Sequence, residues 1–565
     1  MRQIRLTPRR ALAAIAALAS LALAACAQAN AHVVRRNASD TVVIRSQQEP
    51  DKLNPTITNA IAAVDCTTPI FNGLVGVDDH LQLFPDLLTV LPTPENGMVK
   101  PEGKGMLVTF KLRPGVRFHD GVPLTSHDVW FCWKLHMDPK VIVNSRDGYD
   151  KITGVDTPDP LTAVVHFKEP YAPYLRLFSL PNDPILPAHL LEKMDGADFN
   201  VSTFNRAPVG TGPFKFKEWV SGDHVGLVAN PDYFRGAPKL KKLYIKFVPD
   251  DNAAFIQLAN GDIDVYADFN LEQVEAAKRL PYLFVANMPS LTYEQISFNL
   301  KKPLFQDVAI RKAIAHAINK DELSRTIYKG MWPVAQGTEH PLSWSYNPKV
   351  GVPYPYDPAK ARAILDAAGW KPGPDGIRVK NGQRLSFTMT STAGRKTREQ
   401  VEQVIAGYLK AVGIEMAIQN VEGGLLFASY PTGLLQSYKY DTALFAYSTG
   451  VDPSDNLANW HSHQVPPEGQ NTTHFINAEM DRVLDEGNRT LARKDRQPLY
   501  WKMTDILNAN LPVIPLVFWT EMHGVNRHLM NFRANPSSSR FVWNVQDWYI
   551  DDASPSAGGK AENPS

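Results

Sequence analysis

The sequence predicts an α/β protein with a partly parallel sheet. The clearest evidence is a strand, helix and strand within about 34 residues. Residues 385–389 and 414–418 alternate apolar and polar side chains, and residues 397–412 carry apolar side chains at helical spacing. Such a short strand–helix–strand stretch forms a parallel βαβ unit, whose helix packs on one face of the sheet. The 44 Pro and 35 Gly residues, spread along the chain, divide it into many short elements.

Capping residues mark the ends of the predicted helices. We expect Thr397 and Gln400 to form a capping box at the start of the helix in the βαβ unit, and Gly413 to follow its end. A second helix is expected after Asp357, with Pro358 in its first turn. The apolar faces of this helix and of a third, beginning at Asp307, comprise Ala361, Ile364, Leu365, Ala368, Ile310, Ile314, Ala317 and Ile318. These faces are expected to build the core rather than a cofactor site.

Residues 1–25 have the pattern of an export signal. Four arginines precede an apolar run at residues 11–25, which is broken only by Ser20. As a helix the run would be about 22 Å long, shorter than the roughly 30 Å hydrocarbon core of a bilayer, and no comparable run follows. We therefore expect a periplasmic protein whose mature form has no transmembrane helix.

The export signal ends in a sequence that resembles the bacterial lipobox. Residues 23–26 read Leu-Ala-Ala-Cys, and in lipoproteins the thiol of such a Cys carries the lipid. We expect cleavage before Cys26 and its lipidation, which would attach the protein to the membrane. The alternative is cleavage after residues 27–29 or 29–31, which also fit a signal-peptidase site and give a product without an anchor. Ordered structure is expected from Asp40, and the Ser-, Pro- and Gly-rich residues 551–565 are expected to be disordered.

Composition excludes a nucleic-acid-binding protein. Removal of residues 1–25 leaves 55 basic and 58 acidic residues, so the mature chain has no excess of positive charge. About 540 residues, with 44% hydrophobic side chains overall, suffice for several domains with large cores. Cys66 and Cys132 are predicted to be separate buried thiols, although an oxidising compartment would allow a disulfide if their Cα atoms lay close together.

The sequence lacks the familiar motifs of hydrolases, metalloproteases and phosphate-binding enzymes. Residues 210–213, Gly-Thr-Gly-Pro, lack the Lys-Ser/Thr of a phosphate loop. His461, His463 and His474 have no diagnostic metal spacing, and alternate residues of a strand would point to opposite faces. The acidic pairs Asp452 with Asp455 and Asp262 with Asp264 have a spacing typical of solvated residues. We therefore predict no enzyme, no cofactor and no metal site.

Several segments match one family in both order and spacing. The most specific are residues 109–129 (TFKLRPGVRFHDGVPLTSHDV), 209–216 (VGTGPFKF), 230–234 (NPDYF) and 258–264 (LANGDID). Residues 48–55, 71–74 and 85–87 are weaker matches, and the likeness continues at residues 297–314, 357–370 and 512–516. From about residue 42 to 530 the chain resembles the bacterial extracellular solute-binding proteins of family 5, the dipeptide and oligopeptide binders of ABC importers.

The resemblance implies a two-lobed periplasmic-binding-protein fold with an inserted small domain, the type II, large peptide-binding class. The implied segments are a signal peptide at 1–25, lobe I at 40–77, 205–289 and 511–550, the small domain at 78–204, lobe II at 290–510 and a disordered tail at 551–565. A solute would lie between the lobes and be enclosed when they close. The implied partners are a peptide or peptide-like solute and the ABC permease and ATPase, and a monomer is expected.

Peptide binders of this family hold the ligand's ammonium group with an Asp that follows an aromatic residue. In residues 447–453 the corresponding loop is one residue shorter, and that position falls on Thr449 or Gly450. Asp452 or Asp455 would have to replace this Asp. Otherwise the solute is a modified or N-blocked peptide, an opine, an oligosaccharide or another small solute such as a metal complex.

Eight positions are the candidate ligand contacts that the resemblance implies. Tyr447 could stack on the solute or simply pack in the core, and Asp452 could contact the solute or cap a turn. The eight are Tyr447, Asp452, Asp455, Asn456, Trp460, Glu49, Asn72 and Asn299. A periplasmic hydrolase, or a binding protein that acts as a chaperone or sensor, remain the alternative classes.

Overall fold

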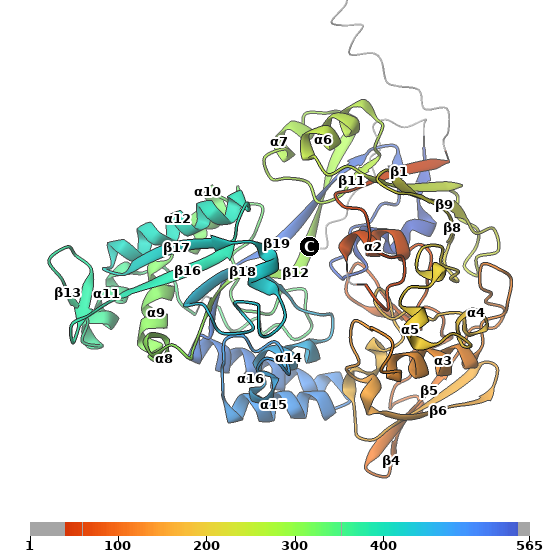
Figure 1. Ribbon diagram of the computed structural model, residues 1–565, viewed down its shortest axis with the longest axis horizontal. Coiled ribbons are helices and arrows are strands. Elements are labelled where there is room, and N and C mark those ends of the chain that lie inside the picture. The colour runs from red at the N-terminus through yellow and green to blue at the C-terminus, as the bar shows by residue number, and fades with distance from the viewer. Residues whose placement is uncertain (1–39, 59, 352, 552–565) are drawn as a thin grey trace, which may run out of the picture.

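The computed structural model of the protein describes residues 40–58, 60–351 and 353–551. The predicted signal segment, Cys26 and the tail beyond Asp551 lie outside these residues. Three regions are visible: a lobe that holds both ends of the described chain, a small domain beside it, and a second lobe that fills the left half of Figure 1. This arrangement confirms the predicted mixed α/β class.

A ten-stranded sheet runs through both lobes in the order β17-β16-β18-β12-β19-β11-β1-β10-β9-β8. Its strands are β1 (Thr41–Ser46), β8 (Phe214–Val220), β9 (His224–Ala229), β10 (Lys242–Phe247), β11 (Val265–Tyr266), β12 (Leu283–Phe298), β16 (Ser386–Thr392), β17 (Glu415–Val421), β18 (Thr442–Ser448) and β19 (Val513–Asn526). Parallel pairs join β1 to β10 and β11, and β16 to β17 and β18, whereas the other pairs are antiparallel.

The two lobes are connected by the long antiparallel strands β12 and β19. At one end β19 pairs with β11 of the first lobe through Val525 and Gly524. At the other end β12 pairs with β18 of the second lobe over residues 292–298. Between these ends the register of β12 against β19 shifts between Pro289 and Tyr293, so the ladder is interrupted midway between the lobes. Two strands with an interrupted ladder are a suitable position for a hinge.

The predicted βαβ unit is present in the second lobe. β16 and β17 pair in parallel, and α12 (Lys396–Ala411) lies between them in the chain. Gly413 follows the helix with φ of +87°, as predicted. The predicted capping box of Thr397 and Gln400 is wrong, because the N-cap is Arg395, two residues before Thr397, and it makes no side-chain cap. Arg398 in the first turn forms an ion pair with the buried Glu294.

The remaining helices of the second lobe cover its part of the sheet. They are α8 (Pro303–Gln306), α9 (Val308–Ala317), α10 (Lys320–Thr326), α11 (Pro358–Ala367), α13 (Gly423–Phe427), α14 (Asn456–Trp460), α15 (Ala478–Arg489) and α16 (Arg493–Asn510). The predicted N-caps are confirmed: the Asp307 side chain accepts from the Ala309 N–H, and the Asp357 side chain accepts from the Lys360 N–H. Residues of α9 and α11 share one core cluster with β16, as their apolar faces predict.

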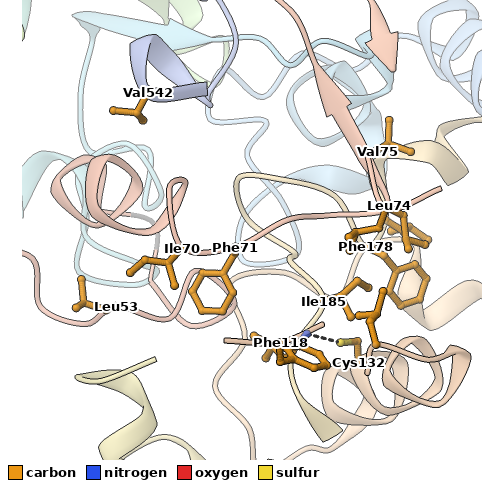
Figure 2. Packing of buried hydrophobic residues seen from close by; sticks show 14 of the residues in the cluster. Leu53, Ile70, Phe71, Leu74, Val75, Phe118, Cys132, Phe178, Ile185 and Val542 are labelled. Atoms are coloured by element: carbon orange, nitrogen blue, oxygen red, sulfur yellow. Dashed lines mark hydrogen bonds between the residues drawn. The ribbon is translucent and has the colours of Figure 1, made fainter. Parts of the chain in front are cut away.

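The first lobe and the small domain share one hydrophobic core. The first lobe contains α2 (Ile61–Thr67), α6 (Asp251–Asn260) and α7 (Val274–Ala277). The small domain contains the sheet β4-β5-β7-β6, with β4 (Val99–Glu102), β5 (Gly105–Lys111), β6 (Ile152–Asp159) and β7 (Thr162–Phe167), and the helices α3 (Ser126–Met137), α4 (Ala188–Leu191) and α5 (Gly196–Phe199). Figure 2 shows Phe71 and Leu74 of the first lobe near Phe118, Phe178 and Ile185 of the small domain. This continuous packing fixes the small domain to the first lobe.

Short elements complete the described chain. They are β2 (Val75–Val77), β3 (Leu83–Pro85), β13 (Lys371–Pro372), β14 (Arg378–Lys380), β15 (Gln383–Arg384), β20 (Leu529–Met530), β21 (Tyr549–Ile550) and six 3₁₀ helices, among them η2 (Ala172–Arg176) and η4 (Pro453–Asp455). Cys66 and Cys132 are both buried and both free, so the prediction of separate thiols is confirmed. The Cys132 sulfur instead accepts a hydrogen bond from the Leu186 N–H at 3.3 Å (Figure 2). Each helix in the described residues is too short or too polar to cross a bilayer.

Candidate functional site

A cavity of about 220 Å³ lies in the second lobe, on one face of β12 and β18. Its floor is made by side chains that alternate along these two antiparallel strands: Tyr293, Gln295 and Ser297 from β12, and Phe445 and Tyr447 from β18. Alternate residues of a strand point to the same face, which is why these five share the cavity. The opposite side of the cavity is formed by Phe427 of α13 and by Asn459 and Trp460 of α14. Leu435 and Thr473, from loops, complete it.

Two of the predicted ligand contacts, Tyr447 and Trp460, therefore line the same cavity. The ring of Tyr447 lies 6.1 Å from that of Tyr293, and its hydroxyl accepts a hydrogen bond from the Asn459 side chain. Burial raises the pKa of Tyr447 to about 12, so its hydroxyl is neutral at physiological pH. The indole N–H of Trp460 donates to the Asn456 side chain at 3.2 Å.

Asn456 does not line the cavity but holds Trp460 in place. Its amide nitrogen donates to the Glu339 carboxylate and to the Pro453 carbonyl, each at 3.0 Å. Glu339 is buried, and Ser345 donates a further hydrogen bond to it. Burial raises the pKa of Glu339 above its usual value. These buried hydrogen bonds fix the position of α14 above the cavity.

Asp452 is neutralised within the second lobe. Its two carboxylate oxygens accept hydrogen bonds of 2.7 and 2.8 Å from the guanidinium group of Arg496 on α16. Arg496 is almost completely buried, with a 5% exposed side chain, whereas the Asp452 side chain is 24% exposed. Burial acts to raise the pKa of Asp452, but the charge and hydrogen bonds of Arg496 outweigh it and hold this pKa below its usual value. Asp452 is therefore an ionised carboxylate that already has a counter-charge.

Asp455 is paired with a residue of the other side of the molecule. Its partner Arg176 belongs to η2 of the small domain and also donates to Asp147. A second, longer ion pair of 3.8 Å between Arg489 and Glu169 joins α15 to the same region. Burial raises the pKa of Asp455 above its usual value, against the opposing charge of Arg176. Helices α14, α15 and α16 lie where the second lobe approaches the small domain (Figure 1).

The other three predicted contacts lie away from the cavity and have partners of their own. The Glu49 carboxylate accepts from the Trp219 indole at 2.7 Å and from a backbone N–H of the first lobe. Asn72 donates to Asp86 at 3.0 Å and borders a separate cavity of about 30 Å³, the size of one water. Asn299 donates to two backbone carbonyls of the second lobe, at 2.8 and 2.9 Å.

Several residues of the cavity were not predicted from the sequence. Gln295 and Ser297 alternate with Tyr293, and this alternation was a usable signal because it places all three on one face of a strand. Phe427 and Asn459 had no such signal, since they come from short helices in other parts of the chain.

The three histidines considered as metal ligands do not form a site. The rings of His461 and His463 lie 5.2 Å apart, whereas His474 packs against Tyr438. Across the residues described, no group of three or more His, Cys, Asp or Glu side chains is placed to hold a metal ion. The acidic residues Asp481 and Asp485 lie near His461 as ion-pair partners.

Known proteins resemble the chain over most of its length. The family model of the bacterial extracellular solute-binding proteins, family 5, matches residues 99–467. The chain is 29% identical to the oligopeptide-binding protein AppA of Bacillus subtilis over 90% of this chain and 91% of that protein. It is 31% identical to protein XP55 of Streptomyces lividans over 84% and 82% of the two chains.

Solved structures show the same fold. The structure of Bacillus subtilis AppA in complex with a nonapeptide matches with a TM-score of 0.73, covering 90% of this chain and 99% of AppA at 28% identity. NikZ of Campylobacter jejuni, in complex with Ni(L-His), matches with a TM-score of 0.75, covering 91% and 100% of the two chains at 25% identity. The chain has the type II fold of these binding proteins and belongs to the bacterial extracellular solute-binding proteins of family 5.

Proposed function

We propose that the protein is the solute-binding receptor of an ABC importer and captures peptides between its two lobes. The match to an oligopeptide-binding protein along nine-tenths of both chains supports a peptide as the solute. The solved relative with a nonapeptide supports the same ligand class at a TM-score of 0.73. The receptor would pass the peptide to a membrane permease and its ATPase without changing it chemically.

The observation that carries this proposal is the position of the cavity beside the contact between the lobes. Residues 447–460 form one wall of the cavity through Tyr447 and Trp460. The same segment reaches the small domain through Asp455 and Arg176. A ligand group in the cavity would therefore lie next to the surface where the lobes meet, and closure of the lobes would remove it from water. Binding free energy would then favour the closed form that the permease recognises.

Tyr447 and Trp460 are proposed as direct ligand contacts, because both line the cavity. Asn456 is proposed to act through Trp460, which it orients. Asp452 and Asp455 are proposed to bind the solute only with their arginine partners in place, as neutral ion pairs rather than free carboxylates. As ligand contacts Glu49, Asn72 and Asn299 remain predictions. The internal hydrogen bonds of these three side chains support a second proposal, that they stabilise the fold.

The proposal includes export of the protein from the cytoplasm. Export follows from residues 1–25, and the family name describes extracellular proteins. Lipidation at Cys26 would keep a monomeric receptor near its permease. The alternative cleavage sites would release it into the periplasm.

The test is calorimetric titration of the purified protein with a set of defined pentapeptides. We expect Tyr447→Ala and Trp460→Phe to lower the affinity at least about fivefold, since each alters a wall of the cavity. Tyr356→Ala is the matched control, because Tyr356 is an exposed aromatic residue far from the cavity in sequence. Binding that is equal in all variants would show that the cavity is not the site. The absence of binding to any peptide would overturn peptide capture, and peptides recovered as cleavage products would point to a hydrolase.

A further inference from the structure

We infer that the cavity of the second lobe selects one side chain of the peptide: an uncharged aromatic ring that carries a hydrogen-bond donor, as in tyrosine or tryptophan. This inference rests on the proposed capture of peptides and names the class of peptide. Four features of the cavity carry it: its volume, its aromatic walls, its lack of charge and one buried amide oxygen without a partner.

The volume fits an aromatic side chain. A dry apolar cavity of about 150 Å³ is known to hold a benzene ring. The cavity here is about 220 Å³, so it accommodates a ring with an additional polar group or a fused second ring. A methyl or isopropyl side chain would leave much of this space empty, and the unfilled volume would lower its affinity.

Aromatic side chains line the cavity on several sides, so a guest ring can meet both the faces and the edges of other rings. Phe427 and Phe445 meet nearly perpendicularly, with centroids 5.8 Å apart at an interplanar angle of 77°. Tyr293 and Trp460 border the same space, and both are almost completely buried. Aromatic rings attract one another in edge-to-face and offset arrangements beyond the effect of area alone. A guest ring would therefore be favoured over an aliphatic side chain of the same size.

The cavity contains no charged side chain among the residues that line it. The nearest acidic residues on the adjoining segment, Asp452 and Asp455, are already paired with Arg496 and Arg176. A lysine, arginine, aspartate or glutamate side chain would therefore lose its hydration without gaining a counter-charge. The cost of such burial excludes charged guests.

Gln295 supplies the polar contact. This residue is only 4% exposed, and its amide oxygen has no hydrogen-bond partner in the described part of the chain. Two neighbouring side-chain amides already donate elsewhere: Asn459 donates to Tyr447, and Gln436 donates to Gln470 at 2.9 Å. A buried amide oxygen without a donor is costly. This oxygen is turned away from the open space, and a half-turn of the amide group would bring it to face the cavity, where a phenol O–H or an indole N–H of the guest would satisfy it. This oxygen distinguishes tyrosine and tryptophan from phenylalanine.

The experiment uses the full protein and alanine pentapeptides in which one residue is replaced, at each position in turn, by Tyr, Trp, Phe, Lys or Glu. Calorimetric titration gives the dissociation constants. At one position we expect Tyr and Trp to bind about three- to tenfold more tightly than Phe, the range of one net hydrogen bond. Lys and Glu should bind at least about tenfold more weakly than Phe at that position.

Two variants of Gln295 assign the preference to its side chain. Gln295→Leu should abolish the advantage of Tyr over Phe at that position. Gln295→Glu keeps a hydrogen-bond acceptor and adds a negative charge. It should therefore retain the preference for Tyr over Phe and raise the affinity for Lys relative to that for Phe. Gln383→Leu, on the exposed strand β15, is the control for general effects of an amide-to-leucine change.

The outcomes separate this inference from the proposed function. If peptides bind but no position distinguishes Tyr from Phe or from Lys, the inference is wrong and peptide capture stands. If the preference for Tyr over Phe persists in Gln295→Leu, the assignment to this cavity is wrong. If no pentapeptide of the set binds, both the function and the inference are overturned.

Discussion

Arg176 of the small domain and Asp455 of the second lobe form an ion pair that joins the two sides of the molecule. Arg176 also binds Asp147 within its own domain, so one guanidinium group holds two carboxylates from different parts of the fold. The first lobe and the small domain share a core, whereas the second lobe is attached to them mainly by β12 and β19. The pair therefore bridges the two bodies that β12 and β19 connect.

Arg176→Gln is expected to loosen the closed arrangement. Exposed and half-exposed ion pairs contribute up to about 1 kcal/mol, so the affinity for a bound peptide should fall by no more than about fivefold. Small-angle X-ray scattering should show a larger radius of gyration for the unliganded variant. Arg384→Gln is the control, because Arg384 binds Asp375 and Glu415 within the second lobe alone. Equal radii and affinities in the two variants would contradict this function of Arg176.

Asp452→Asn is expected to destabilise the second lobe. The substitution leaves the buried Arg496 without its counter-ion, a change that costs up to about 3–5 kcal/mol in a fully buried pair. Thermal unfolding followed by calorimetry should show a clearly lower midpoint. Glu479→Gln, which breaks the exposed pair with Lys502, should change the midpoint little. A midpoint as high as that of the control would mean that the pair of Asp452 and Arg496 adds nothing to stability.

The pH dependence of stability should contain a contribution from Glu402 of α12. This residue is fully buried and receives one hydrogen bond, from Asn420 at 2.9 Å. Burial raises its pKa to about 7 from an ordinary value of 4.5. Between these values the folded protein keeps a proton that the unfolded chain releases, so the free energy of unfolding falls as pH rises through this window. The slope for one such group is at most about 1.4 kcal/mol per pH unit.

Glu402→Gln should remove this contribution, so that the variant loses less stability than the wild type between pH 5 and pH 8. Urea unfolding at the two pH values measures the difference. Glu468→Gln changes an exposed carboxyl group and should leave the pH dependence as in the wild type. Parallel pH profiles for Glu402→Gln and the wild type would refute the assignment.

Gly212→Ala is expected to disturb the packing of two segments of the first lobe. A methyl group at this position would lie 2.5 Å from both the Ile70 carbonyl carbon and the Pro69 oxygen, which are backbone atoms that cannot rotate away. We expect a loss of more than about 1 kcal/mol in the free energy of unfolding. Gly154→Ala provides the comparison, since its methyl group would meet no atom within 4 Å. Chemical denaturation of both variants measures the effect, and similar values would show that the backbone contact at Gly212 is unimportant.

The fold was predictable from the sequence where local patterns determine it. Alternation at residues 385–389 and 414–418, and the N-caps Asp307 and Asp357, lie within the segments they specify. The start of α12 was not predictable in this way. No side chain caps this helix, and Arg398 of its first turn pairs with Glu294, 104 residues away in the chain.

The candidate site was predictable only in part, for the same reason. Tyr447 and Trp460 were found through the resemblance to a family, and both line the cavity. That Asp452 and Asp455 are neutralised could not be foreseen, because their arginine partners lie 44 and 279 residues away. Gln295 could have been found from the alternation along its strand. That its amide oxygen has no hydrogen-bond donor could not, because this depends on which side chains from distant segments pack around it.

The most direct measurement of the central claim is to identify the solute that the protein carries from its natural source. The protein is purified without denaturation, its solute is released by unfolding, and mass spectrometry identifies the released compounds. The account predicts intact peptides that are enriched in tyrosine or tryptophan and are depleted in a Tyr447→Ala variant. Recovery of a sugar, an opine or a metal complex in place of peptides would contradict it.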